Sequence, residues 1–134
     1  IRFPYESDGT THFITARIDR IDADDAGIHV IDYKTGNPTK SRLEPSSSDL
    51  QLGIYYMAAR AFFEGEIRGT AEYWLTRTNQ RGVLDFARIK EDRVRQTIDE
   101  VIDGILAGRW QQDPRCRNCD LLLAGTDAAP PEED

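Results

Sequence analysis

One stretch, residues 16–36 (ARIDRIDADDAGIHVIDYKTG), constrains the fold of this chain more than any other. Its apolar and β-branched residues predict two short strands, at residues 13–22 and residues 28–34. The sequence ADDAG between them is a turn signal that ends in glycine. The stretch is therefore typical of two strands that pair as a hairpin.

The polar residues of this stretch carry chemical information. Side chains alternate between the faces of a strand, so Asp32 and Lys34 share a face at the end of the second strand. Hairpin pairing would bring Asp19, on the first strand, near Asp32. Two close carboxylates repel each other, and a hard divalent cation with oxygen ligands relieves that repulsion. Because a lysine beside such a metal can hold an attacking water or offset transition-state charge, the three residues fit metal-dependent phosphodiester hydrolysis.

Spacing alone favours a simpler interpretation of the same residues. An aspartate and a lysine two residues apart are common at strand ends, and Asp19, Asp32 and Lys34 can be solvated charges or an ion pair on a surface hairpin. The choice between the two interpretations depends on the rest of the chain.

Three motifs occur in a fixed order: ARIDRID at residues 16–22, VIDYKTG at residues 30–36 and QLGIY at residues 51–55. Together they resemble the RecB-like branch of the PD-(D/E)xK nuclease superfamily, whose members carry a G-x-I-D-R-I-D strand, a V-I-D-Y-K-T-G strand and a Q-x-x-x-Y helix in this order. The resemblance is strong over residues 12–65, although any one motif alone would be weak. One departure is Ala16, which stands where the family usually has glycine.

The resemblance implies a role for each residue of the two strand motifs. Asp19 and Asp32 would be ligands of Mg²⁺ or Mn²⁺, and the backbone carbonyl of Tyr33 would complete the metal shell. Lys34 would be the catalytic lysine that positions the water.

Gln51 and Tyr55 lie on a helix predicted over residues 49–64, four residues apart and therefore on one face. The resemblance implies that they face the site and orient it or the DNA strand. The sequence from Ser48 to Gln51 is also a capping box, which gives Gln51 a purely structural explanation. The two roles are compatible if the helix begins at the mouth of the site.

The remaining patterns predict the rest of an α/β domain. Residues 1–5 are expected to pair with a strand after His12, residues 69–77 with residues 83–87, and residues 90–107 have the periodicity of an amphipathic helix. We expect a mixed, mostly antiparallel central sheet of four to six strands flanked by helices. By resemblance this is the core of a restriction-endonuclease-like domain.

A loop over residues 36–48 is rich in Gly, Pro and Ser, and its only cations are Lys40 and Arg42. Loops that follow active-site strands often contact the substrate, so these side chains are candidate contacts to DNA phosphates. A solvated loop accounts for them equally well.

Composition limits the function classes. The chain has 134 residues and a formal net charge of −7, whereas a simple nucleic-acid-binding module is normally basic. A nuclease is not excluded, because a metal site is acidic and its bound ions reverse the local field. No apolar run approaches the ~20 residues of a membrane helix, and no signal peptide is recognised. We expect a cytoplasmic protein without a disulfide framework, since its two cysteines lie close together.

Those cysteines, Cys116 and Cys119, form a C-x-x-C that resembles part of the iron–sulfur site of some RecB-like domains. Such a cluster needs four thiolates, and this chain offers two, so we expect no complete iron–sulfur cluster in it. The predicted nuclease domain covers residues 1–124, and residues 125–134 form an acidic tail that we expect to be disordered.

The leading prediction is a Mg²⁺- or Mn²⁺-dependent DNA nuclease, either the nuclease module of a DNA-repair helicase–nuclease or a RecB-family exonuclease. The alternative is a catalytically inactive DNA-binding or scaffold module of the same fold, and a third is a hydrolase of another phosphate ester. RecB-like enzymes usually draw a further ligand from a helix before the first core strand. Because the chain begins at Ile1 rather than methionine, we expect a fragment that lacks this helix and cleaves weakly without it.

Overall fold

The computed structural model describes residues 1–109, and its first two strands form a hairpin. β1 (Arg2–Ser7) pairs antiparallel with β2 (Thr10–Thr15). Asp8 and Gly9 connect them with φ angles of 48° and 70°. A two-residue hairpin turn needs this left-handed region, which glycine and aspartate tolerate better than most residues. The turn sequence therefore encodes the hairpin, as predicted.

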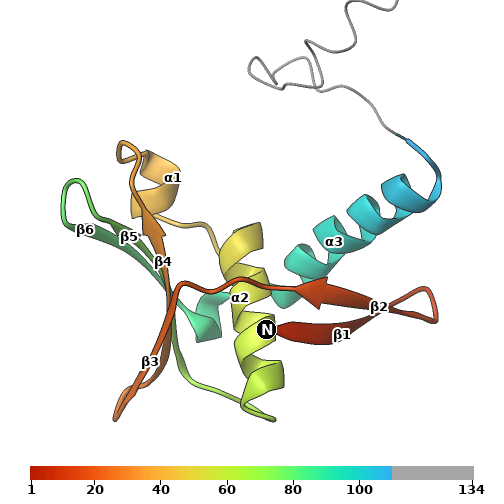
Figure 1. Ribbon diagram of the computed structural model, residues 1–134, viewed down its shortest axis with the longest axis horizontal. Helices are drawn as coiled ribbons and strands as arrows, with labels where there is room; N and C mark the ends of the chain where they lie inside the picture. The colour runs from red at the N-terminus through yellow and green to blue at the C-terminus, as the bar shows by residue number, and fades with distance from the viewer. Residues whose placement is uncertain (110–134) are drawn as a thin grey trace, which may run out of the picture. The chain divides into compact units, whose positions relative to one another are not determined.

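A separate sheet contains four strands in the order β3, β4, β5, β6 (Figure 1). They are β3 (Arg20–Asp24), β4 (Gly27–Lys34), β5 (Gly69–Leu75) and β6 (Gln80–Asp85). β4 is antiparallel to β3 and parallel to β5, and β5 is antiparallel to β6. The sheet is mixed and mostly antiparallel, as predicted. The parallel pair brings the ends of β4 and β5 to the same edge of the sheet.

The prediction of one strand over residues 13–22 is wrong. The first hairpin ends at Thr15, and β3 begins only at Arg20, in the other sheet. The backbone N–H of Ala16 still bonds to Ile1 O at 2.8 Å, and the chain then leaves the hairpin. Apolar residues continue across this break, so the sequence pattern gave no sign of it.

Within residues 1–109 the helical segments are α1 (Lys40–Leu43), α2 (Leu50–Phe62), the 3₁₀ helix η1 (Phe86–Arg88) and α3 (Glu91–Leu106). α2 contacts β4, β5 and β1, and in Figure 1 it lies beside the four-stranded sheet. None of the helices within residues 1–109 combines the length and apolar character needed to cross a membrane.

The N-cap of α2 is Asp49, whose side chain accepts a hydrogen bond from Leu52 N at 3.0 Å. The predicted capping box between Ser48 and Gln51 is therefore wrong. Aspartate is as good a cap as serine, so the sequence allows either residue. The position at which the helix begins decides which of the two caps it. The Gln51 side chain is therefore not used for capping, and it contacts the sheet instead.

The first turns of α3 pack closely against α2 at Gly53. A Cβ on this residue would lie only 2.5 Å from Cγ2 of Val94, which is fully buried. Ion pairs join the same two helices, because Glu91 accepts hydrogen bonds from Arg60 of α2 and from Arg95 of its own helix. Glycine at position 53 thus lets α2 and α3 approach closely, and the ion pairs of Glu91 hold the two helices together at the edge of this contact.

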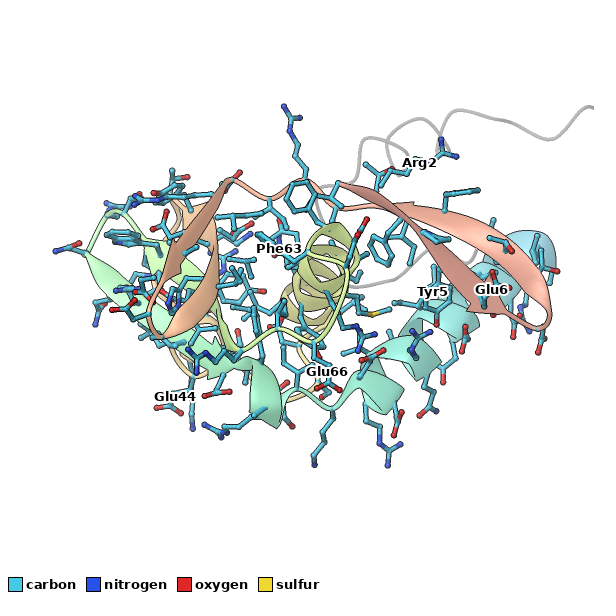
Figure 2. All side chains as sticks on the ribbon, turned by 90° about the horizontal axis from the view of Figure 1, so that it is seen from below. Arg2, Tyr5, Glu6, Glu44, Phe63 and Glu66 are labelled. Atoms are coloured by element: carbon cyan, nitrogen blue, oxygen red, sulfur yellow. The ribbon has the colours of Figure 1, made fainter. Side chains whose placement is uncertain are left out.

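The first hairpin contacts α3 through Tyr5, which Figure 2 shows between the hairpin and that helix. The Tyr5 hydroxyl donates to Asp99 Oδ1 at 2.9 Å, and the Ser7 hydroxyl donates to the same oxygen at 2.7 Å. Residues 1–100 form one compact unit that contains every site discussed below, and the end of α3 belongs to a second unit. The cysteine pair Cys116 and Cys119 and the predicted acidic tail lie outside the described residues.

Candidate active site

Asp32 lies near the end of β4 and is only 5% exposed. Its Oδ1 accepts hydrogen bonds from Gln51 Nε2 at 2.8 Å and from the Tyr55 hydroxyl at 3.0 Å. Its Oδ2 lies 2.6 Å from Lys34 Nζ. A carboxylate this deeply buried requires charged and hydrogen-bonding partners. The β4 strand supplies one of them and α2 supplies two.

Lys34 and Gln51 complete a closed network with Asp32. Lys34 shares a face of β4 with Asp32, as strand alternation predicts, and donates to Gln51 Oε1 at 3.0 Å. The amide orientation follows from its two partners, because only the nitrogen can donate to a carboxylate and only the oxygen can accept from an ammonium group. Gln51 faces the site, as the resemblance implied, and its role in catalysis stays a prediction.

Tyr55 follows Gln51 by one helical turn and joins the same network. Its hydroxyl accepts from Gln51 Nε2 at 2.9 Å and lies 2.8 Å from Arg17 O as well as close to Asp32. Since the hydroxyl has one proton, it donates to one of these two oxygens at a time. Burial, reinforced by the neighbouring charges of Asp32 and Asp19, raises the pKa of Tyr55 to about 12. Tyr55 therefore remains a proton donor at neutral pH.

Asp19 lies across from Asp32, although it is not in a strand. The last β3–β4 pair is Arg20 with Ile31, so the next position in this antiparallel register sets Asp19 against Asp32. The Asp19 Oδ2 accepts a hydrogen bond from the backbone N–H of Tyr33 at 2.9 Å. The register of the hairpin thus places the two predicted carboxylates on neighbouring segments at one end of β4.

Tyr33 contributes only its backbone to this region. Its ring lies on the opposite face of the sheet, packs against Trp74 with ring centroids 5.7 Å apart, and is 37% exposed. Alternation along β4 explains the split, since Asp32 and Lys34 lie on the other face. A role for Tyr33 in metal binding would therefore have to come from its carbonyl, as the resemblance implied.

The donor groups fit a divalent cation. The Asp32 Oδ2 is buried and accepts no hydrogen bond from the described residues, because Lys34 Nζ stands at ion-pair distance without hydrogen-bond geometry. Residues 1–109 contain no cluster of three or more His, Cys, Asp or Glu side chains that could hold a metal. Mg²⁺ does not require such a cluster, since it is commonly held by one or two carboxylates together with waters and substrate phosphate oxygens. Asp19 and Asp32 match that requirement.

Lys40 and Arg42 lie on α1, where a continuous loop was predicted. The Lys40 side chain is exposed and that of Arg42 is half-buried. The α1 backbone packs tightly on β6, because a Cβ on Gly82 would lie 1.7 Å from Arg42 O. Within the part of the chain that the structure describes, neither cation belongs to the network around Asp32. Their contact with DNA stays a prediction.

Sequence reasoning missed Tyr73, which is the register partner of Asp32 on the parallel strand β5. The Tyr73 hydroxyl donates to Asp49 Oδ1 at 2.9 Å and lies 3.4 Å from Gln51 Oε1. The ring centroid is 5.3 Å from Lys34 Nζ. Alternation along residues 69–77 predicts the face of Tyr73 but not which strand lies beside it, so no signal in the sequence tied it to the site.

The comparison with protein families agrees with this geometry. The family model described as the PD-(D/E)XK nuclease superfamily matches residues 2–122, which include the four-stranded sheet, α2 and the whole network around Asp32. No curated protein and no solved structure matches the chain significantly. A match of this extent shows the family: the chain belongs to the PD-(D/E)XK nuclease superfamily.

Proposed function

We propose that this chain is a metal-dependent deoxyribonuclease of the RecB-like branch of the superfamily. The observation that carries the proposal is the closed network of Asp32, Lys34 and Gln51, with Asp19 across from it. A solvated surface hairpin does not account for an aspartate that is 5% exposed and receives hydrogen bonds from a helix. The network also joins residues from all three ordered motifs.

Asp19 and Asp32 would hold Mg²⁺ or Mn²⁺, with the carbonyl of Tyr33 as a further oxygen ligand. When bound, the cation supplies Lewis-acid stabilisation of the charge that develops on the phosphate. The proposal needs no cluster of three acidic side chains, since the substrate and water contribute the remaining ligands. An iron–sulfur cluster has no part in it.

Lys34 would position the attacking water and stabilise negative charge in the transition state. The Lys34 ammonium group has three protons: one is donated to the Gln51 amide oxygen, while the Asp32 carboxylate pairs with the charge at 2.6 Å without accepting a hydrogen bond. At least one proton therefore remains for a water or a phosphate oxygen. Water forms the new bond to phosphorus and releases a proton, the bond to the leaving sugar oxygen breaks and that oxygen takes up a proton, and no covalent link to the protein forms.

The finer assignment rests on the resemblance carried by the three ordered motifs. It includes DNA as the substrate, a role in DNA repair, and a helicase domain or subunit as partner. The cytoplasmic location is a separate proposal, based on the two closely spaced cysteines. Lys40 and Arg42 would contact backbone phosphates, because they follow the strand that ends at Lys34.

The variant Lys34→Ala tests the proposal. We expect the wild-type chain to cleave DNA with Mn²⁺ and not with EDTA, and the variant to lose about 100-fold or more in rate while binding DNA almost as well. Lys90→Ala is the matched control, because Lys90 is an exposed lysine just before α3. Thermal unfolding of both variants checks that the fold is intact.

A second readout concerns the metal without any need for turnover. We expect Mn²⁺ to raise the melting temperature of the wild-type chain and to raise that of Asp32→Asn much less, because a ligand stabilises only the state that binds it. DNA binding without cleavage or metal stabilisation would instead support an inactive module. Cleavage of small phosphate esters but not DNA would support the other hydrolase class.

A further inference from the structure

We propose that Tyr73 is a positioning residue that holds Gln51, and through it Lys34, in the reactive arrangement. This inference rests on the proposed function, because it assigns a residue to the same site. It concerns a side chain outside the three motifs, which becomes part of the site only through the parallel pairing of β4 with β5.

The hydroxyl of Tyr73 connects the sheet to the first turn of α2. It donates to Asp49 Oδ1, and the same oxygen accepts the N–H of Leu52 and so caps the helix. Gln51 lies between Asp49 and Leu52 in the sequence, and its side chain extends from the helix toward Asp32 and Lys34 of the sheet. The hydrogen bond from Tyr73 therefore fixes the segment from which the Gln51 side chain extends.

Tyr73 also borders the Gln51 amide and the lysine directly. Its hydroxyl oxygen lies 3.4 Å from Gln51 Oε1, the atom that accepts from Lys34 Nζ. The Tyr73 ring lies 5.3 Å from that ammonium nitrogen, within the range of a cation–π interaction. The Tyr73 side chain thus restricts the positions of both Gln51 and Lys34, the two partners of this hydrogen bond.

Burial of the Tyr73 side chain shields its contacts with Asp49, Gln51 and Lys34 from water. Tyr73 is 5% exposed, and burial together with the hydrogen bond to Asp49 raises the pKa of its hydroxyl far above the usual value. The hydroxyl therefore stays protonated and able to donate at neutral pH. Without it, the start of α2 loses this hydrogen bond to β5, which leaves the Gln51 amide freer to rotate away from Asp32 and Lys34.

The decisive variant is Tyr73→Phe, which keeps the ring and removes the hydroxyl. We expect kcat for DNA cleavage to fall about fivefold and KM to stay nearly constant, since the hydroxyl orients protein groups and does not touch DNA. Tyr5→Phe is the matched control: Tyr5 is 2% exposed and donates to the carboxylate of Asp99, far along the chain from the site. It should leave kcat unchanged.

A double-mutant cycle separates positioning from general support of the fold. If Tyr73 acts through Gln51, Tyr73→Phe should reduce kcat no further once Gln51→Ala is present. Independent, multiplicative losses would overturn the inference. Asp49→Ser supplies a second route, because serine still caps the helix but is too short to hold the Tyr73 hydroxyl. It should reproduce the effect of Tyr73→Phe.

A readout independent of cleavage distinguishes this inference from the proposed function. In ¹H–¹⁵N NMR spectra, the side-chain amide signals of Gln51, assigned by their loss in Gln51→Ala, should shift or broaden in Tyr73→Phe and not in Tyr5→Phe. Unchanged Gln51 signals would overturn the positioning role even for an active nuclease. Shifted signals in a chain that cleaves nothing would uphold the positioning and reject the nuclease.

Discussion

Asp32 shows how a single buried charge organises its surroundings. Taking a carboxylate out of water is costly unless its oxygens are paired, and Lys34, Gln51 and Tyr55 supply the pairs. Lys34 lies two residues after Asp32 on the same strand face, and Gln51 and Tyr55 are four residues apart on one helix face. The need to pair the buried carboxylate therefore explains the spacing within both of these motifs. The Asp32 Oδ2 accepts no hydrogen bond within residues 1–109, and the Lys34 ammonium group 2.6 Å away is its charge partner.

Tyr55→Phe is expected to destabilise the chain by about 1–2 kcal/mol, because it removes a buried hydroxyl that reaches both Arg17 O and Asp32. Urea unfolding followed by circular dichroism measures this free energy. Tyr33→Phe is the control, since the Tyr33 hydroxyl is at the surface and accepts a bond from Arg20. An unfolding midpoint for Tyr55→Phe equal to that of the control would contradict the prediction.

At the scale of elements, the contact between α2 and α3 combines close packing with paired charges. Gly53 allows Val94 to pack against the α2 backbone, and Glu91 joins Arg60 and Arg95 at the rim of the contact. Both α2 and β4 must stay in place for Gln51 to meet Asp32. The ion pairs of α3 therefore support the site from a distance.

Glu91→Gln should destabilise the chain in a pH-dependent way. Burial alone raises the pKa of Glu91, but hydrogen bonds and charges from Arg60 and Arg95 outweigh it and hold this pKa below the usual glutamate value. A group whose pKa is depressed by folding stabilises the protein above its unfolded pKa, and that stability is lost as the pH falls through the folded pKa.

We therefore expect Glu91→Gln to cost about 1 kcal/mol at pH 7, a value discounted for the partial exposure of both arginines, and progressively less as the pH falls below the usual glutamate pKa toward the lowered folded pKa. Urea unfolding across this pH range measures the difference. Asp92→Asn controls for charge at the start of the helix, since Asp92 is exposed in the same turn. A cost that is constant with pH would show that the ion pairs are not its source.

The whole molecule carries a net charge of −7, yet cations gather where β4 and β5 end. Lys34 closes β4, α1 carries Lys40 and Arg42, and Arg77 follows β5 and donates to Asn37 at 3.0 Å. This edge is the same one at which Asp32 lies. Within residues 1–109, these cations give a polyanion an attractive edge on a chain whose net charge is negative.

The double variant Lys40→Ala with Arg42→Ala is expected to weaken DNA binding and to reduce the slope of log K against log[salt] by up to about 0.9 for each phosphate that the variant no longer neutralises. Fluorescence anisotropy of labelled DNA across a salt series measures this slope. Lys90→Ala with Arg93→Ala changes the net charge equally at the start of α3 and serves as the control. Equal slopes for the two double variants would show that α1 does not contact DNA.

The sequence by itself determined the features that depend on neighbours along the chain. Strand alternation placed Asp32 and Lys34 on one face, the ADDAG turn placed β3 beside β4, and helical spacing aligned Gln51 with Tyr55. Each follows from the fixed geometry of one element, so residue spacing was sufficient.

The tertiary structure alone decided which elements meet. It broke the predicted first strand after Thr15, moved the α2 cap to Asp49, and paired β4 with β5 so that Tyr73 lies beside Asp32. These outcomes depend on packing between segments distant in sequence, and packing is a property of the whole core rather than of any local pattern. Spacing within one segment therefore placed Asp32 and Lys34 together, whereas their neighbours on α2 and β5 came from packing between segments.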